Sequence, residues 1–142
     1  MISAVLDTNV LASGAVSAYN PPGQILDAWR LGKFELITSE HIIDELYCTF
    51  QKPYFQKHVN GNDIAAFIEL LQNEAIITPI TTRVSGVAAH PKDDLIIAAA
   101  ISAKTDYLVT GDGALLRRVA DSYQGIKLVT PSDFLRILKQ YN

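Results

Sequence analysis

The stretch AVLDTNVLASG, residues 4–14, begins as an apolar run and is then cut by an aspartate. Its small and apolar residues predict a buried strand over residues 2–6. Asp7 ends that strand, and Thr8 and Asn9 follow before the apolar residues resume. A carboxylate in such a place is either an ordinary turn former or part of a site. The rest of the chain has to decide between these two interpretations.

Strands and helices alternate along the remainder of the sequence. Short apolar runs predict strands at residues 34–38, 75–80, 106–110 and 126–130. Apolar residues three and four apart predict helices that begin after Asn20, Ser39 and Asn62, at Asp93 or Asp94, at Ala114 and after Thr130, with a short helical piece after Pro53. This alternation is typical of α/β proteins and predicts a mainly parallel central sheet with helices on both faces.

Composition and charge narrow the class of protein. The chain has 142 residues, 49 % of them hydrophobic and 19 % charged, which fits a single globular domain over residues 1–142. Its formal net charge of −3 excludes a strongly basic groove, so any contact with nucleic acid has to be local or assisted by a metal ion. The single cysteine, Cys48, excludes a disulfide framework and a cysteine-rich zinc site. With no signal peptide and no apolar run of membrane-spanning length, we expect a cytoplasmic protein that does not bind membranes.

Several aspartates fall where a parallel sheet would bring them together. Asp7 follows the first strand, Asp112 follows the strand at 106–110, and Asp93 and Asp94 open the helix that leads into that strand. In a parallel sheet the carboxyl ends of the strands share one edge, and ligands bind there. Clustered carboxylates repel one another unless a cation lies between them, and oxygen ligands alone suit Mg²⁺ or Mn²⁺. The pattern therefore favours a shared metal site over separate helix caps.

A bound metal ion would define the chemistry of such a site. It polarises a phosphoryl oxygen and lowers the pKa of a bound water. Thr8, Asn9 and Thr110 lie beside the acids at the strand ends and are suited to orient them by hydrogen bonds. Without a His or Lys pair beside the acids, the pattern favours a metal-activated water as the nucleophile over acid–base catalysis by side chains.

A further acid is expected on the helix that follows Ser39. This helix offers Asp44 and Glu45, which flank its apolar stripe on opposite sides, so helical periodicity leaves both open. The histidines are weaker signals that we expect to be structural or exposed: His41, His58 and His90.

Four segments of the chain, taken in order, resemble one known family. They are VLDTNVLASG, SEHIIDELYCTFQKPYF, HPKDDLIIAAAISAKTDYLVTGDGALL and LVTPSDFLRIL. Together they resemble the bacterial PIN-domain proteins related to VapC, which are toxin components of toxin–antitoxin systems. The resemblance covers nearly the whole chain. It implies a metal-dependent endoribonuclease with a three-layer α/β/α sandwich around a mainly parallel sheet.

The resemblance also implies roles for particular residues. Its catalytic, metal-holding acids fall on Asp7, Glu45, Asp94 and Asp112, with Mg²⁺ or Mn²⁺ as the cofactor. It selects Glu45 over Asp44 because the family's helix glutamate precedes a leucine. The residues expected to support these acids are Thr8, Asn9, Asp93 and Thr110.

The partners implied are an RNA substrate, an antitoxin protein and a second copy of the chain in a homodimer. The apolar helix from Ile64 to Leu71 adds to the dimer expectation, because one small core need not bury its full face. The chain departs from the family at His90, where relatives often carry aspartate. It departs again at Gly113–Ala114, where relatives often carry a charged residue and then aspartate. Both departures bear on metal occupancy and on how substrate is placed.

Two other functions share part of this pattern. A phosphatase of the haloacid dehalogenase class needs a second aspartate two residues after the first, where this chain has Asn9. It also needs one four or five residues after its late Gly-Asp, where this chain has Leu116 and Arg117. A non-catalytic PIN-fold module that binds RNA or protein stays open, although an intact set of acids argues against it.

Overall fold

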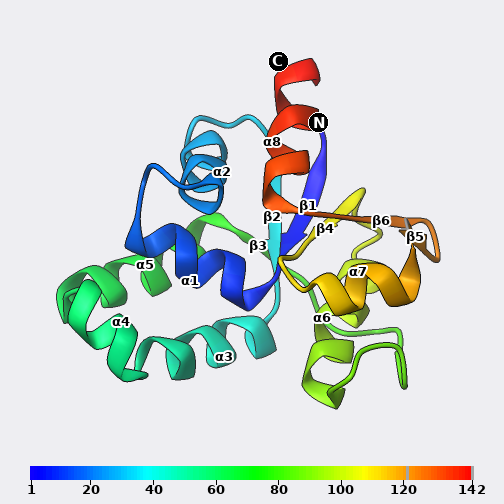
Figure 1. Ribbon diagram of the computed structural model, residues 1–142, viewed down its shortest axis with the longest axis horizontal. Helices are drawn as coiled ribbons and strands as arrows, with labels where there is room; N and C mark the ends of the chain where they lie inside the picture. The colour runs from blue at the N-terminus through cyan, green and yellow to red at the C-terminus, as the bar shows by residue number, and fades with distance from the viewer. Residues whose placement is uncertain (121, 142) are drawn as a thin grey trace.

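A computed structural model describes residues 1–120 and 122–141 and shows a six-stranded sheet at the centre of the molecule (Figure 1). The order of the strands is β3-β2-β1-β4-β6-β5, and all neighbours are parallel except β5 and β6. The strands are β1 (Ser3–Leu6), β2 (Glu35–Thr38), β3 (Ile76–Ile77), β4 (Tyr107–Val109), β5 (Ser122–Tyr123) and β6 (Ile126–Val129). The mainly parallel α/β sheet predicted from the sequence is therefore confirmed.

Helices fill most of the connections between these strands. They are α1 (Thr8–Val16), α2 (Pro21–Arg30), α3 (Glu40–Phe50), α4 (Pro53–His58), α5 (Gly61–Glu74), α6 (Pro91–Ser102), α7 (Gly113–Val119) and α8 (Pro131–Tyr141). Polar side chains fix where several of them begin. Asn20 accepts a hydrogen bond from the Gly23 amide at the start of α2, and Ser39 accepts one from the Ile42 amide at the start of α3. None of the helices within the described residues is long and apolar enough to cross a membrane.

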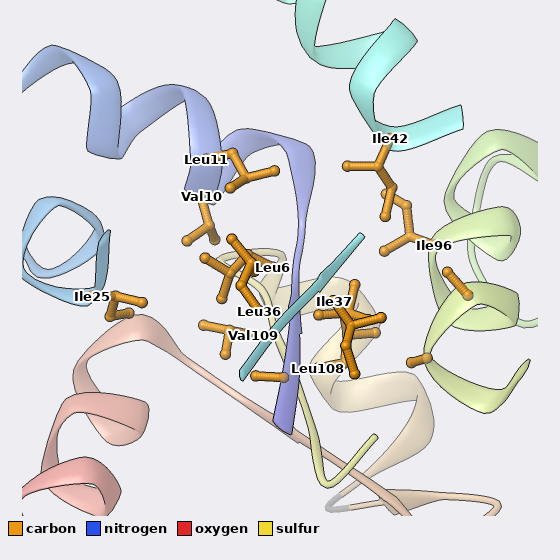
Figure 2. Packing of buried hydrophobic residues seen from close by; sticks show 14 of the residues in the cluster. Leu6, Val10, Leu11, Ile25, Leu36, Ile37, Ile42, Ile96, Leu108 and Val109 are labelled. Atoms are coloured by element: carbon orange, nitrogen blue, oxygen red, sulfur yellow. The ribbon is translucent and has the colours of Figure 1, made fainter. Parts of the chain in front are cut away.

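Both faces of the sheet are covered, which makes the fold a three-layer sandwich (Figure 2). On one face Leu6, Leu36 and Val109 point toward α1 and α2, where Val10, Leu11 and Ile25 meet them. On the other face Ile37 and Leu108 point toward α6, which contributes Ile96. Successive residues of a strand point to opposite faces, so the continuously apolar strands supply both layers of the core.

The order of the strands places the start of the chain at the centre of the sheet. From β1 the chain moves outward through β2 to β3, and then returns to the other side of β1 to form β4. The carboxyl ends of β1 and β4 therefore lie at a topological switch point, where open α/β sheets bind their ligands. The register pairs Leu6 with Val109, so Asp7 and Thr110 leave the sheet side by side.

Several elements differ from the sequence-based expectations. Helix α1 begins directly at Thr8, a helix that the sequence did not predict. Helix α5 is capped by Asn60 and not by Asn62, because the Asn60 side chain accepts the amides of residues 62 and 63. Helix α6 begins at Pro91 with His90 at its N-cap, so both Asp93 and Asp94 lie inside its first turn. The strand expected at 75–80 is reduced to β3, and the short strand β5 is additional.

Candidate active site

A chain of hydrogen bonds joins two of the predicted acids at the switch point. The Thr110 hydroxyl donates to Oδ2 of Asp7 at 2.7 Å, and its oxygen accepts the amide of Asp112 at 3.1 Å. The Asp7 amide donates to the carbonyl of Val109 at 2.9 Å, which fixes the backbone of Asp7 against β4. Thr110 is 0 % exposed, so this link is shielded from competing water.

Asp112 is held in place by the helix that it caps. Its Oδ1 accepts the amides of Ala114 at 3.0 Å and Leu115 at 3.1 Å at the start of α7. This is ordinary N-cap geometry, and it engages only one of the two carboxylate oxygens. Asp112 is exposed, so its side chain is reachable from solvent.

Helix α3 brings Glu45 to the same edge of the sheet. Glu45 is half-buried, whereas its neighbour Asp44 is exposed. Oε2 of Glu45 is enclosed and has no hydrogen-bond partner. His41 lies one turn earlier on α3, and its Nε2 is 3.4 Å from that oxygen. The same Nε2 lies 3.3 Å from the carbonyl oxygen of Lys92, so His41 connects α3 to the first turn of α6.

Electrostatic interactions show which acids face one another. Burial is the main reason that the pKa of Asp7 is raised, and the charges of Asp93 and Glu45 raise it further against the opposing hydrogen bond from Thr110. Burial is also the main reason that the pKa of Asp93 is raised. Glu45, Asp112 and Asp94 add to that rise, and nearby His90 opposes it. We call Asp7, Glu45, Asp93 and Asp112 the acid cluster.

Asp94 has surroundings of a different kind. It is 5 % exposed, and both of its carboxylate oxygens accept backbone hydrogen bonds from the loop that precedes α6. Oδ2 accepts the Gly86 amide at 3.0 Å, and Oδ1 accepts the amides of Val87 at 3.1 Å and Ala88 at 2.7 Å. Gly86 has a φ of 74°, a conformation that glycine adopts without strain, and the turn there aims the amides at Asp94. Asp94 thus holds the loop to α6.

The remaining predicted residues are divided between the interior and the surface. Thr8 is 1 % exposed, and its hydroxyl has no hydrogen-bond partner. The same holds for Thr38, at the carboxyl end of β2. Asn9, in contrast, is exposed in the first turn of α1.

His41 contacts Glu45, although the sequence led us to expect a structural or exposed residue there. The signal available for it was its position one helical turn before Glu45.

The donors at this edge suit a hard divalent cation by their chemistry. The acid cluster offers carboxylate oxygens, and the enclosed Oε2 of Glu45 is a buried acceptor without a partner. Within residues 1–120 and 122–141, however, no three His, Cys, Asp or Glu side chains are arranged so that they could hold a metal ion. The acids are therefore near enough for their charges to raise the pKa values of Asp7 and Asp93, but they do not adopt ligand geometry.

Comparison with known proteins adds independent evidence on the family. A family model for the PIN domain matches residues 3–114. An uncharacterized protein of Methanocaldococcus jannaschii, MJ1680, is 27 % identical over 147 residues, which cover 99 % of this chain and 94 % of that protein. The crystal structure of FitAcB from Neisseria gonorrhoeae has a similar fold, with a TM-score of 0.53 at 16 % identity, over 91 % of this chain and 98 % of that chain. The match to the family model spans most of the chain and includes both Asp7 and Asp112, which Thr110 links by hydrogen bonds. The chain therefore belongs to the PIN-domain family.

Proposed function

We propose that this protein is a metal-dependent endoribonuclease that hydrolyses phosphodiester bonds of RNA. PIN domains are typically nucleases, and they generally bind a divalent metal ion. The observation that carries the proposal is the convergence of acids on the β1–β4 switch point, where Thr110 links Asp7 to Asp112 by hydrogen bonds and the charges of Asp93 and Glu45 raise the pKa of Asp7. Such mutual repulsion is tolerated in a folded protein when a cation offsets it.

The residues that would hold Mg²⁺ or Mn²⁺ are the four of the acid cluster. The resemblance noted in the sequence assigned the third acid to Asp94. The hydrogen bonds of Asp94 favour its neighbour instead, because both Asp94 oxygens already serve loop amides. Asp93 is half-buried and interacts with Glu45 and Asp112, so we assign the metal-facing role to Asp93.

The metal ion would supply a water of lowered pKa and would polarise the phosphoryl oxygen. The rest of the catalytic work falls to the side chains of this protein. Thr110 fixes Oδ2 of Asp7, and the α7 amides fix Oδ1 of Asp112, so both carboxylates are oriented before substrate arrives. His41 holds Glu45 close to the first turn of α6, which carries Asp93. Prepositioning of this kind lowers the reorganisation that the reaction requires.

The decisive test is cleavage of single-stranded RNA by purified protein with Mn²⁺, with Mg²⁺ and with chelator. We expect cleavage only with metal, giving 5′-phosphate and 3′-hydroxyl ends, because water is the nucleophile. A substrate with one 2′-deoxy residue at the scissile position should be cut about as fast. Cyclic phosphate ends that persist in chelator would contradict the proposal. RNA binding without cleavage under any metal condition would favour the alternative, a non-catalytic PIN-fold binding module.

The biological role follows the family resemblance. As a toxin of a toxin–antitoxin pair in the cytoplasm, the protein would inhibit growth when produced alone, and an antitoxin would relieve the inhibition. Growth that is unaffected by production of active protein would contradict this role. Homodimer formation rests on the resemblance alone, because Ile64, Phe67 and Leu71 of α5 are buried within the chain itself. Sedimentation at tens of micromolar would decide between monomer and dimer.

A further inference from the structure

Arg117 lies over Gly113, the first residue of α7, which directly follows Asp112 of the acid cluster in the chain. Helix side chains lean toward the N-terminus, so residue 117 reaches back over residue 113, four positions earlier. The distances agree with this direction, because a methyl group added at Gly113 would lie 3.2 Å from Nη1 of Arg117. The missing side chain at Gly113 therefore leaves room for a guanidinium group beside the residue that follows Asp112.

The guanidinium of Arg117 is open to solvent in the part of the chain that the structure describes. Among the described residues, it forms no ion pair and no hydrogen bond, whereas Arg136 is paired with Asp133 on α8. A guanidinium whose N–H donors have no other partner can bind a phosphate through two parallel hydrogen bonds.

We propose that Arg117 is a substrate-binding residue that contacts a phosphate of the RNA strand next to the scissile bond. The inference rests on the proposed function. An acid cluster on a chain with a net charge of −3 repels a polyanion. A cation beside the residue that follows Asp112 offsets that repulsion where the strand has to enter. The departure from the family at Gly113 gives the guanidinium this position.

The test compares Arg117→Gln with Arg118→Gln. Arg118 is the matched control, because it is the neighbouring residue on α7 and is also exposed. Its substitution by glutamine removes the same charge. Steady-state cleavage of a fluorescent single-stranded RNA with Mn²⁺ gives kcat and KM. Equilibrium binding of the same RNA with Ca²⁺ in place of Mn²⁺ gives Kd over a range of salt concentrations.

For Arg117→Gln we expect KM and Kd to rise about tenfold. The slope of log Kd against the logarithm of the salt concentration should fall by the amount expected for the loss of one phosphate contact. Arg118→Gln should stay within about twofold of the parent protein. Gly113→Ala should shift KM and Kd in the same direction by less, because its methyl group displaces the guanidinium without removing it. The melting temperature of the Gly113→Ala variant should not fall, because alanine favours a helix more than glycine does.

The outcomes separate this inference from the proposed function. Equal effects of Arg117→Gln and Arg118→Gln, with active parent protein, would overturn the role of Arg117 and leave the nuclease proposal standing. RNA binding by the parent protein without cleavage would overturn the nuclease proposal, and the binding comparison would still decide whether Arg117 contacts phosphate. A parent protein that neither binds nor cleaves RNA would overturn both.

Discussion

Asp93 and Asp94 are adjacent in the first turn of α6, yet they belong to different parts of the molecule. Asp93 faces other acids, and Glu45 and Asp112 raise its pKa beyond the effect of burial. Asp94 faces the loop before α6, where three backbone amides surround its carboxylate. One acid is placed among repelling charges and the other among hydrogen-bond donors.

This contrast indicates that Asp93 lowers the stability of the metal-free fold and that Asp94 raises it. Repulsion within the acid cluster destabilises the metal-free fold, and it is retained where a cation is to bind. The amides around Asp94 bond to both of its carboxylate oxygens and so order the loop. Substitution of the two acids should therefore have opposite effects on activity and on stability.

The largest effect on activity is expected for Asp93→Asn. The amide keeps the size of the side chain but removes one of the charges proposed to hold the metal ion. We expect RNA cleavage to fall by about 100-fold or more, the scale seen when an electrostatic group of an active site is removed. Melting in chelator should be unchanged or shifted upward, because repulsion by Glu45 and Asp112 is relieved. Full activity in this variant would remove Asp93 from the site.

The largest effect on stability is expected for Asp94→Asn. The side-chain NH2 group of asparagine replaces Oδ2 and faces the Gly86 amide, which then lacks an acceptor, while the remaining oxygen still accepts the amides of Val87 and Ala88. We expect this to cost about 2–3 kcal/mol in the free energy of unfolding. Denaturant unfolding measures this loss. Asp63→Asn is the matched control, since Asp63 is an exposed acid in the first turn of α5 and its loss should cost under about 1 kcal/mol. A stable but inactive Asp94→Asn protein would return the metal-facing role to Asp94.

The sequence was sufficient to place the strand-end acids. The apolar runs at 2–6 and 106–110 are short and bounded, so their carboxyl ends could be located within a residue or two. Parallel pairing then brings Asp7 and Asp112 to one edge. The cap at Ser39 was also predictable, because a serine before a helical apolar pattern accepts the free amides of the first turn.

Helical periodicity alone could not separate Asp93 from Asp94, and the choice of Asp94 rested on the family resemblance. Consecutive residues differ by about 100° around a helix, and the partner that gives them different surroundings is the loop at 86–88. That loop has no apolar period from which its path could be predicted. Helix α1 was missed for a related reason, because the apolar residues after Asn9 are compatible with several kinds of structure until the sheet packs against them.

A smaller effect is expected where Thr110 connects Asp7 to the backbone of Asp112. Thr110→Val preserves the shape of the side chain and removes the hydroxyl that donates to Asp7. We expect affinity for Mn²⁺, measured by calorimetry, to fall about 10–100-fold, as for other residues that orient metal ligands. Thr105→Val is the control, because the Thr105 hydroxyl is buried but bonds only to the carbonyls of Ala100 and Tyr107. Equal metal affinities in the two variants would show that the Asp7–Thr110 contact does not prepare the site.

The smallest effect is expected in how the metal-free fold responds to pH. The pKa values of Asp7 and Asp93 are raised above the usual 3.8, chiefly by burial, so the folded protein holds these protons more tightly than the unfolded chain does. Each group therefore contributes stability that is fully present below pH 3.8 and is lost as pH rises through the raised pKa. The asparagine of the Asp7→Asn variant does not titrate in this range. In chelator, the melting temperature of the variant should therefore rise relative to that of the parent protein as pH increases from acidic to neutral. Excess Mg²⁺ should reverse the trend for the parent protein, because the cation binds the ionised carboxylates and its stabilisation increases with pH. A difference that stays constant with pH in chelator would mean that Asp7 does not carry a raised pKa, and that repulsion within the acid cluster is weaker than its arrangement indicates.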